Sequence, residues 1–227
     1  MHEIYGSYVV LTFLHTYIGV RMRLTDDTRR WLGTLLVSSY VCAFSNAPLR
    51  YESDYLFGSA QPYQQMSELV GCVMTYLLCD LLHQPKQWDV CIHHVESVAG
   101  LAFSLLGYNV GVLNNCVLGE YSSFWLVLVH FSKPFTIPFV STLVVPISWA
   151  FFVITFVYYR IIPCVVMSWS IASDVSRATR DSAASVHTFL FCIHCSLQFY
   201  WLGKIGKLVA VRLIPRFLHV HGRVKGA

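Results

Sequence analysis

Residues 90–131 read VCIHHVESVAGLAFSLLGYNVGVLNNCVLGEYSSFWLVLVHF. They contain two apolar stretches that meet at Tyr108 and Asn109. Each stretch, 90–108 and 110–131, has about the 20 residues that a helix needs to cross the hydrocarbon core of a bilayer. Because almost nothing lies between them, the two helices are predicted to form a tight antiparallel hairpin.

Further apolar stretches flank this hairpin on both sides. Only 12% of the 227 residues are charged, 56% are hydrophobic and the mean hydropathy is +0.55, whereas a soluble domain carries about a quarter charged residues. We therefore predict an all-α, polytopic transmembrane helical bundle of about seven helices, with six also possible because several stretches are short or carry polar residues. The predicted spans are 4–20, 31–48, 66–82, 90–108, 110–131, 138–162 and 186–208.

The domain organisation is simple. Residues 1–30 hold the first transmembrane helix, read as a retained signal anchor, and a basic loop; residues 31–209 form the main transmembrane domain; residues 210–227 form a basic tail. In the sixth span, Pro146 removes a helical hydrogen bond and predicts a kink, and Pro163 predicts the end of the helix. The apolar residues 164–172 are either a frayed continuation of that helix or an interfacial segment.

Lysine and arginine are unevenly divided between the two sides of a seven-helix bundle. Most of the 16 basic residues fall on the side of the first loop and the tail, and the opposite side holds Arg50, Arg160, Arg177 and Arg180. The positive-inside rule then places the C-terminus in the cytosol. We interpret the basic tail as an orientation signal that contacts anionic lipid headgroups. It is too short to build a soluble basic face, so we predict no binding of nucleic acid.

The eight cysteines all lie within or at the end of apolar stretches. This placement predicts no disulfide framework. Cys192 and Cys195 form a CxxC pair, but no second pair accompanies it, and we interpret both as small buried helix residues.

Ionisable residues inside the spans carry the functional information, because such residues are costly in lipid and tend to face the bundle interior. The span 90–108 has a polar and small-residue stripe at helical spacing, formed by His93, Glu96, Ser97, Gly100 and Ser104. Such a stripe allows a neighbouring helix or a lipid chain to approach closely.

The adjacent histidines His93 and His94 point about 100° apart on a helix, so both can line one cavity only at its edge. A carboxylate beside an imidazole fixes its tautomer and makes a proton shuttle possible. Glu96 on the same helix and Glu120 across the hairpin are both candidate partners.

The last span repeats this pattern, since His187, His194 and Gln198 share one helical face. They predict either a lined cavity or hydrogen bonds between helices. Asp80, near the end of span 66–82, either lines the same interior or reaches the headgroups. A membrane di-iron centre needs several His boxes, which one His pair cannot supply; no metal site is predicted.

Four pieces of the sequence, in order, resemble the TLC domain. They are Asp80 with residues 88–94, residues 118–123 (LGEYSS), residues 156–163 (FVYYRIIP) and residues 197–205 (LQFYWLGKI). The resemblance covers about residues 31–208. The family includes translocon-associated membrane proteins, the longevity-assurance ceramide synthases and small lipid-homeostasis proteins.

The resemblance implies a specific chemistry for the histidine pair. Ceramide synthases transfer an acyl chain from acyl-CoA to a sphingoid-base amine, using a His pair followed on the next helix by an HDxxD-like acidic pair. The His pair matches His93 and His94, whereas the acidic pair is replaced by Glu120 followed by Tyr121 and two serines. This departure favours the small TLC proteins that act in lipid homeostasis.

From the resemblance we expect a protein of the endoplasmic reticulum membrane that acts in lipid homeostasis through a His-lined lipid-binding cavity. The alternative is a ceramide-synthase-like, acyl-CoA-dependent N-acyltransferase of sphingolipids, and a further alternative is a non-enzymatic translocation or cargo adaptor. The catalytic candidates are His93, His94 and Glu120. The lipid-binding candidates are Asp80, Glu96, Ser97, Ser123, His187, His194 and Gln198. The predicted partners are membrane lipids, such as a sphingoid base or another long-chain lipid, and no cofactor is predicted beyond acyl-CoA as a co-substrate.

Overall fold

A computed structural model describes residues 26–44, 50–51, 56–57, 64–82, 87–132 and 143–213. Within these ranges all regular secondary structure is helical, which confirms the all-α prediction. The predicted span 4–20 and most of the predicted basic tail lie outside the described residues.

Each predicted span within the described ranges contains a helix. The helices are α2 (Asp26–Phe44), α4 (Gln64–Leu82), α5 (Trp88–Leu105), α6 (Val110–Val117), α7 (Glu120–Ser132), α8 (Val145–Phe156), α9 (Ile162–Ser173), α10 (Val175–Ala178) and α11 (Ser182–Leu208). Two π-helical turns, η2 (Val157–Ile161) and η3 (Val209–Leu213), extend α8 and α11. The helices therefore follow the apolar stretches of the sequence.

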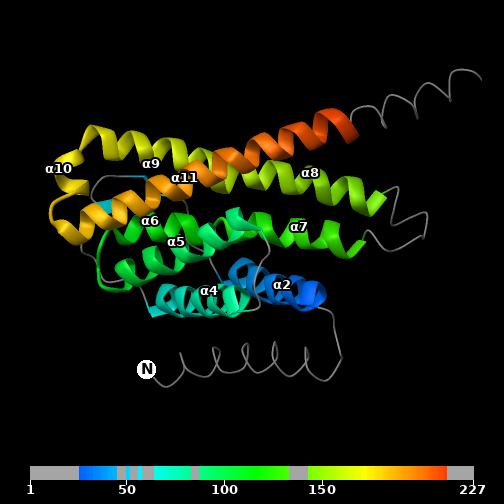
Figure 1. Cartoon of the computed structure of the whole chain (residues 1–227), viewed down its shortest axis with the longest axis horizontal. Helices are drawn as coiled ribbons and strands as arrows, with labels where there is room; N and C mark the ends of the chain where they lie inside the picture. Colours follow the sequence, from blue (N-terminus) through cyan, green and yellow to red (C-terminus); the bar gives the residue numbers. More distant parts are fainter. Residues whose placement is uncertain are drawn as a thin grey trace, which may run out of the picture.

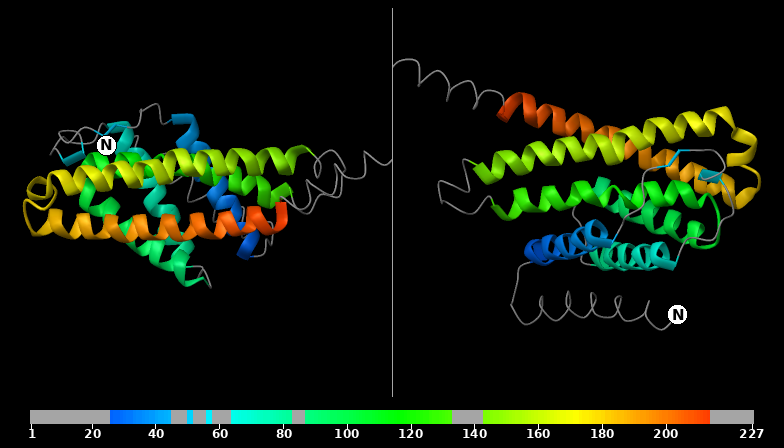
Figure 2. Two further views of the ribbon diagram at one scale, coloured as in Figure 1. Left: turned by 90° about the horizontal axis from the view of Figure 1, so that it is seen from above. Right: turned by 180° about the vertical axis from the view of Figure 1, so that it is seen from behind.

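The helices lie in three levels (Figure 1). The middle level holds α5, α6 and α7; α2 and α4 lie on one side of it, and α8, α9 and α11 on the other. Helix α7 packs against both α2 and α8, and α5 packs against both α4 and α11. Figure 2 shows from above that α11 runs beside α8 and α9, with α10 reversing the chain between α9 and α11. This arrangement makes α5 and α7 the interior of the described bundle.

The turn between α5 and α6 is as tight as the sequence predicts. Gly107 has φ 90° and Asn109 has φ 48°, a left-handed conformation that glycine and asparagine adopt at least cost. The Asn109 amide donates to the carbonyl oxygen of Ala178 (3.5 Å) and to the hydroxyl of Thr188 (3.4 Å). The hairpin is thus fastened to the start of α11.

Both prolines of the sixth span lie at the first or second position of an α-helical segment, Pro146 in α8 and Pro163 in α9. Residues 143–144, directly ahead of α8, are also helical, so the kink predicted at Pro146 stays a prediction. The helix end predicted at Pro163 is wrong, because α9 continues directly from η2, whose wider turn accommodates the proline. Residues 164–172 are a helical continuation.

Two helical stretches within the described residues are long and apolar enough to cross a membrane. They are Val110–Phe131, interrupted by a turn at Leu118 and Gly119, and Val145–Ser173, with 29 residues and a mean hydropathy of 2.0 over its most apolar 18 residues. At 1.5 Å per residue the second stretch is about 44 Å long, which exceeds the roughly 30 Å hydrocarbon core of a bilayer.

The outer face of α8, η2 and α9 is a continuous apolar stripe. Its members recur every three or four residues and are between 41% and 77% exposed: Ile147, Phe151, Ile154, Tyr158, Ile162, Val165 and Trp169. We call these seven residues the outer stripe.

The described cysteines are all free thiols. Cys195 is buried as predicted, but Cys192 is exposed on α11, which corrects the prediction that both are buried.

Candidate functional site

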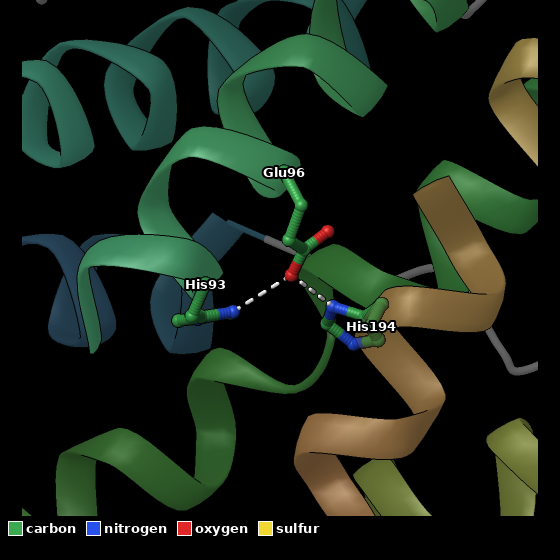
Figure 3. Close-up of side chains that lie close together, drawn as sticks. All are labelled: His93, Glu96 and His194. Carbon is green, nitrogen blue, oxygen red and sulfur yellow. Dashed lines mark hydrogen bonds and ion pairs between the residues drawn. The ribbon is translucent and has the colours of Figure 1, made fainter. Parts of the chain in front are cut away.

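The pairing of α5 with α11 joins two histidines to one buried carboxylate (Figure 3). His93 and Glu96 are one helical turn apart on α5, and His194 approaches from α11. Both imidazoles donate from Nδ1 to Oε1 of Glu96, over 2.9 Å from His93 and 2.8 Å from His194. The Ser97 hydroxyl donates to the same oxygen at 3.1 Å. We call His93, Glu96 and His194 the α5–α11 triad.

The second histidine of the pair has a carboxylate of its own. His94 Nδ1 lies 3.4 Å from Oδ2 of Asp80 on α4, and the two side chains are only about 5% exposed. Asp80 therefore faces the bundle interior rather than the headgroups, the other possibility that its sequence position left open. The two adjacent histidines thus point to different carboxylates, Glu96 and Asp80.

Arg160 in η2 connects the remaining polar groups. Its Nη2 lies 3.7 Å from Oε1 of Glu120 and donates to the Ser123 hydroxyl at 2.9 Å. Its Nε donates to the Ser122 hydroxyl at 2.7 Å, and its Nη1 donates to Oε1 of Gln198 at 3.5 Å. Glu120 therefore pairs with a guanidinium, whereas the sequence suggested a histidine as its partner.

Gly119 lets Arg160 approach the backbone of the turn between α6 and α7. Arg160 Nε donates to the carbonyl oxygen of Gly119 at 3.1 Å. A Cβ atom at residue 119 would lie 2.9 Å from the carbonyl oxygen of Cys116 and 3.3 Å from Cγ of Arg160. A larger residue here would have to displace the guanidinium or the turn.

Gly119→Ala is accordingly expected to lower the free energy of unfolding by about 1–3 kcal/mol, the usual cost of overpacking. Thermal unfolding in detergent measures this change. Gly203→Ala on the exposed face of α11 is the matched control, because a Cβ there meets nothing within 4 Å. The control should be neutral or slightly stabilising; equal stability of the two variants would contradict the close approach of Arg160.

An ion pair lies where α5 begins, ahead of the predicted span 90–108. Asp89 Oδ2 accepts from Nζ of Lys204 at 2.8 Å and from Nε1 of Trp201 at 2.9 Å. Burial alone would raise the pKa of Asp89, but the hydrogen bonds from Lys204 and Trp201 hold that pKa below its ordinary value. Asp89 thus fixes the start of α5 against α11.

Two cavities open among these groups. The larger, of about 520 Å³, is lined by polar groups that include His93, His94, Glu120, Arg160 and Lys204. It is also lined by apolar side chains, among them Leu126, Trp149, Phe152 and Phe156. The smaller, of about 60 Å³, is lined by the whole α5–α11 triad together with Gly100 and His187. His93, Glu120 and Arg160 line both cavities.

The stripe predicted on α5 faces α11, because His187 Nε2 lies 3.3 Å from the Ser104 hydroxyl. On α11, Gln198 Nε2 lies 3.2 Å from Nε2 of His194. The lipid-binding candidates of α11 thus make interhelical contacts or line the smaller cavity. The sequence analysis did not name Arg160 as a site residue. It placed Arg160 near the end of span 138–162 and counted it among the basic residues on one side of the membrane.

Among the described residues, the α5–α11 triad is the group that could hold a metal ion. One donor atom from each of the three side chains lies within 4.8 Å of the other two. Two imidazole nitrogens and one carboxylate oxygen are donors that suit zinc and ferrous iron.

No family model, curated protein or solved structure matches the chain.

Proposed function

We propose that this chain is a TLC-type membrane protein that binds an amphipathic, long-chain lipid in the larger cavity and acts in membrane lipid homeostasis. The observation that carries this proposal is the mixed lining of the cavity, which combines charged and imidazole groups with aromatic and aliphatic side chains. A volume of about 520 Å³ lies within the range of small-molecule sites, roughly 300–1,000 Å³.

The distribution of polar and apolar side chains supports a membrane setting. Glu96, Asp80 and His94 are buried, with exposures of about 5%. The outer stripe leaves large apolar side chains exposed along residues 147–169, and Trp169 is 77% exposed. A soluble monomer rarely exposes so continuous an apolar surface. Lipid tails would cover the stripe and leave the polar groups inside the bundle, as in membrane proteins generally.

The polar part of the cavity suits a headgroup with hydrogen-bond donors and acceptors. Arg160 and Glu120 offer opposite charges on the same wall, and His93 and His94 add two imidazoles. Phe152, Phe156 and Leu126 offer a surface for an acyl or sphingoid chain. A long-chain amine or alcohol matches this lining better than a small polar solute does.

Mass spectrometry of lipids extracted from the purified full-length protein tests this function. Leu126→Trp, which places a larger side chain in the cavity wall, is expected to reduce the retained lipid about tenfold, equivalent to roughly 1.4 kcal/mol of binding free energy. The measurement compares defined lipid species per chain after identical washing in mild detergent.

Ile154→Trp is the matched control, because Ile154 is 62% exposed in the outer stripe and lies away from the cavity wall. It should retain the lipid of the unaltered protein. Equal lipid loss in both variants would mean that the lipid was held on the outer surface. A protein that carries no stoichiometric lipid before substitution would overturn the cavity as a lipid site.

One observation favours a second candidate, acyl transfer from acyl-CoA to a long-chain amine. His94 lines the cavity, and its Nδ1 lies 3.4 Å from Asp80. If this contact tightened to a hydrogen bond, the aspartate would hold the imidazole so that Nε2 could accept a proton from the attacking amine. Formation of an N-acyl product distinguishes this candidate from lipid binding alone.

A further inference from the structure

We propose that the α5–α11 triad is a binding site for one divalent transition-metal ion, zinc or ferrous iron. His93, Glu96 and His194 would be the protein ligands, and the smaller cavity would supply the remaining coordination positions. This site does not depend on which lipid fills the larger cavity or on whether any acyl transfer occurs.

The donor geometry is close to that of a mononuclear site. With metal–ligand bonds of about 2.0–2.1 Å, two ligands of a tetrahedral site are separated by about 3.3 Å. The Nδ1 atoms of His93 and His194 lie 2.9 Å and 2.8 Å from the same Glu96 oxygen. All three donor atoms lie within 4.8 Å of one another, so one ion could contact all three.

Arg160 and Lys204, which line the larger cavity, are each paired with an acidic residue. This pairing limits their repulsion of a bound cation. Arg160 pairs with Glu120 at 3.7 Å, and Lys204 pairs with Asp89 at 2.8 Å. The polar contacts of Glu96 among the described residues are with His93, His194 and Ser97. A buried carboxylate is stable where it is paired or where it coordinates a metal, and a divalent ion would take the place of these hydrogen bonds.

The surroundings of the triad also suit a metal. A ligating histidine usually has its second ring nitrogen held by a hydrogen-bonding group. Nε2 of His194 lies 3.2 Å from Nε2 of Gln198, whose Oε1 accepts from Arg160 at 3.5 Å. Ligation of an ion through Nδ1 leaves the proton on Nε2, so the Gln198 amide would turn its oxygen toward His194 and give up the hydrogen bond from Arg160. The smaller cavity of about 60 Å³ borders all three ligands and can hold water beside an ion.

Elemental analysis of the full-length protein tests the site. The protein is purified without chelator, incubated with one equivalent of zinc chloride or, anaerobically, ferrous sulfate, and desalted. We expect about one zinc or iron per chain. His194→Ala and Glu96→Gln should each lower the bound metal at least tenfold. His130→Ala should keep it, since His130 is a half-buried histidine of α7 stacked on Trp31.

Cobalt substitution of the unaltered protein gives a measurement that needs no folded variant. Visible absorption of bound Co²⁺, and X-ray absorption showing two imidazole ligands, would support the site. Unaltered protein that retains none of these ions after desalting would overturn it, and so would metal retained equally by folded triad variants. Retention of magnesium or calcium alone would also count against it, because those ions prefer all-oxygen ligands.

Discussion

Arg160→Met should lower the free energy of unfolding by about 3–5 kcal/mol, the cost of removing one partner from a buried ion pair. The substitution leaves the Glu120 carboxylate, whose side chain is 12% exposed, without its guanidinium. It also removes the donor that holds the Ser122 and Ser123 hydroxyls. Because folded proteins are stable by only about 5–15 kcal/mol, this loss should be visible as a large drop in thermal stability in detergent.

Lys207→Met is the matched control, since Lys207 is an exposed basic residue near the end of α11. Its loss should change stability by less than about 0.5 kcal/mol. Adding Glu120→Gln to Arg160→Met should restore part of the stability, because no unpaired charge then remains. An Arg160→Met protein as stable as the Lys207→Met protein would show that Glu120 does not depend on this guanidinium.

His94→Ala is expected to reduce N-acyl product by about 10²–10⁴-fold if the second candidate function operates, the usual contribution of a general base. The assay supplies labelled acyl-CoA and a sphingoid base to the purified protein. Asp80→Asn keeps the shape of the side chain but removes the charge 3.4 Å from His94. It should therefore lower product formation while preserving the fold.

His130→Ala again serves as the histidine control and should retain activity. Product formation that persists in folded His94→Ala protein would exclude His94 as the base. An unaltered protein that binds lipid but forms no product would exclude acyl transfer and leave the binding function in place. The two functions are thus separated by one set of samples.

Much of the fold follows from the sequence because the apolar stretches have the length of helices. The turn at residues 107–109 could be predicted from the two stretches that meet there. The prediction that the sixth helix ends at Pro163 is wrong. A proline removes one N–H donor, and the π-helical turn ahead of Pro163 accommodates that loss without ending the helix. Whether a π-helical turn precedes the proline depends on packing around η2, which local sequence does not reveal.

The sequence predicts which site residues lie close together on one helix, but not which residues of different helices meet. The i, i+3 spacing of His93 and Glu96 places them together on α5, and the structure adds their hydrogen bond. His194 is 98 residues further along the chain, and only the pairing of α5 with α11 shows that it shares the same carboxylate. For the same reason the sequence suggested Glu120 as a histidine partner, whereas its neighbour is Arg160.

The distance along the chain between Glu96 and His194 also orders events during synthesis. At about 5–20 residues per second, a ribosome adds the 98 residues that follow Glu96, up to and including His194, in roughly 5–20 seconds. Throughout that interval Glu96 has been synthesised and its partner on α11 does not yet exist. In a chain inserted into a bilayer as it is made, this carboxyl group therefore relies on His93 and Ser97 of its own helix, on a proton or on the insertion machinery until the last helix arrives.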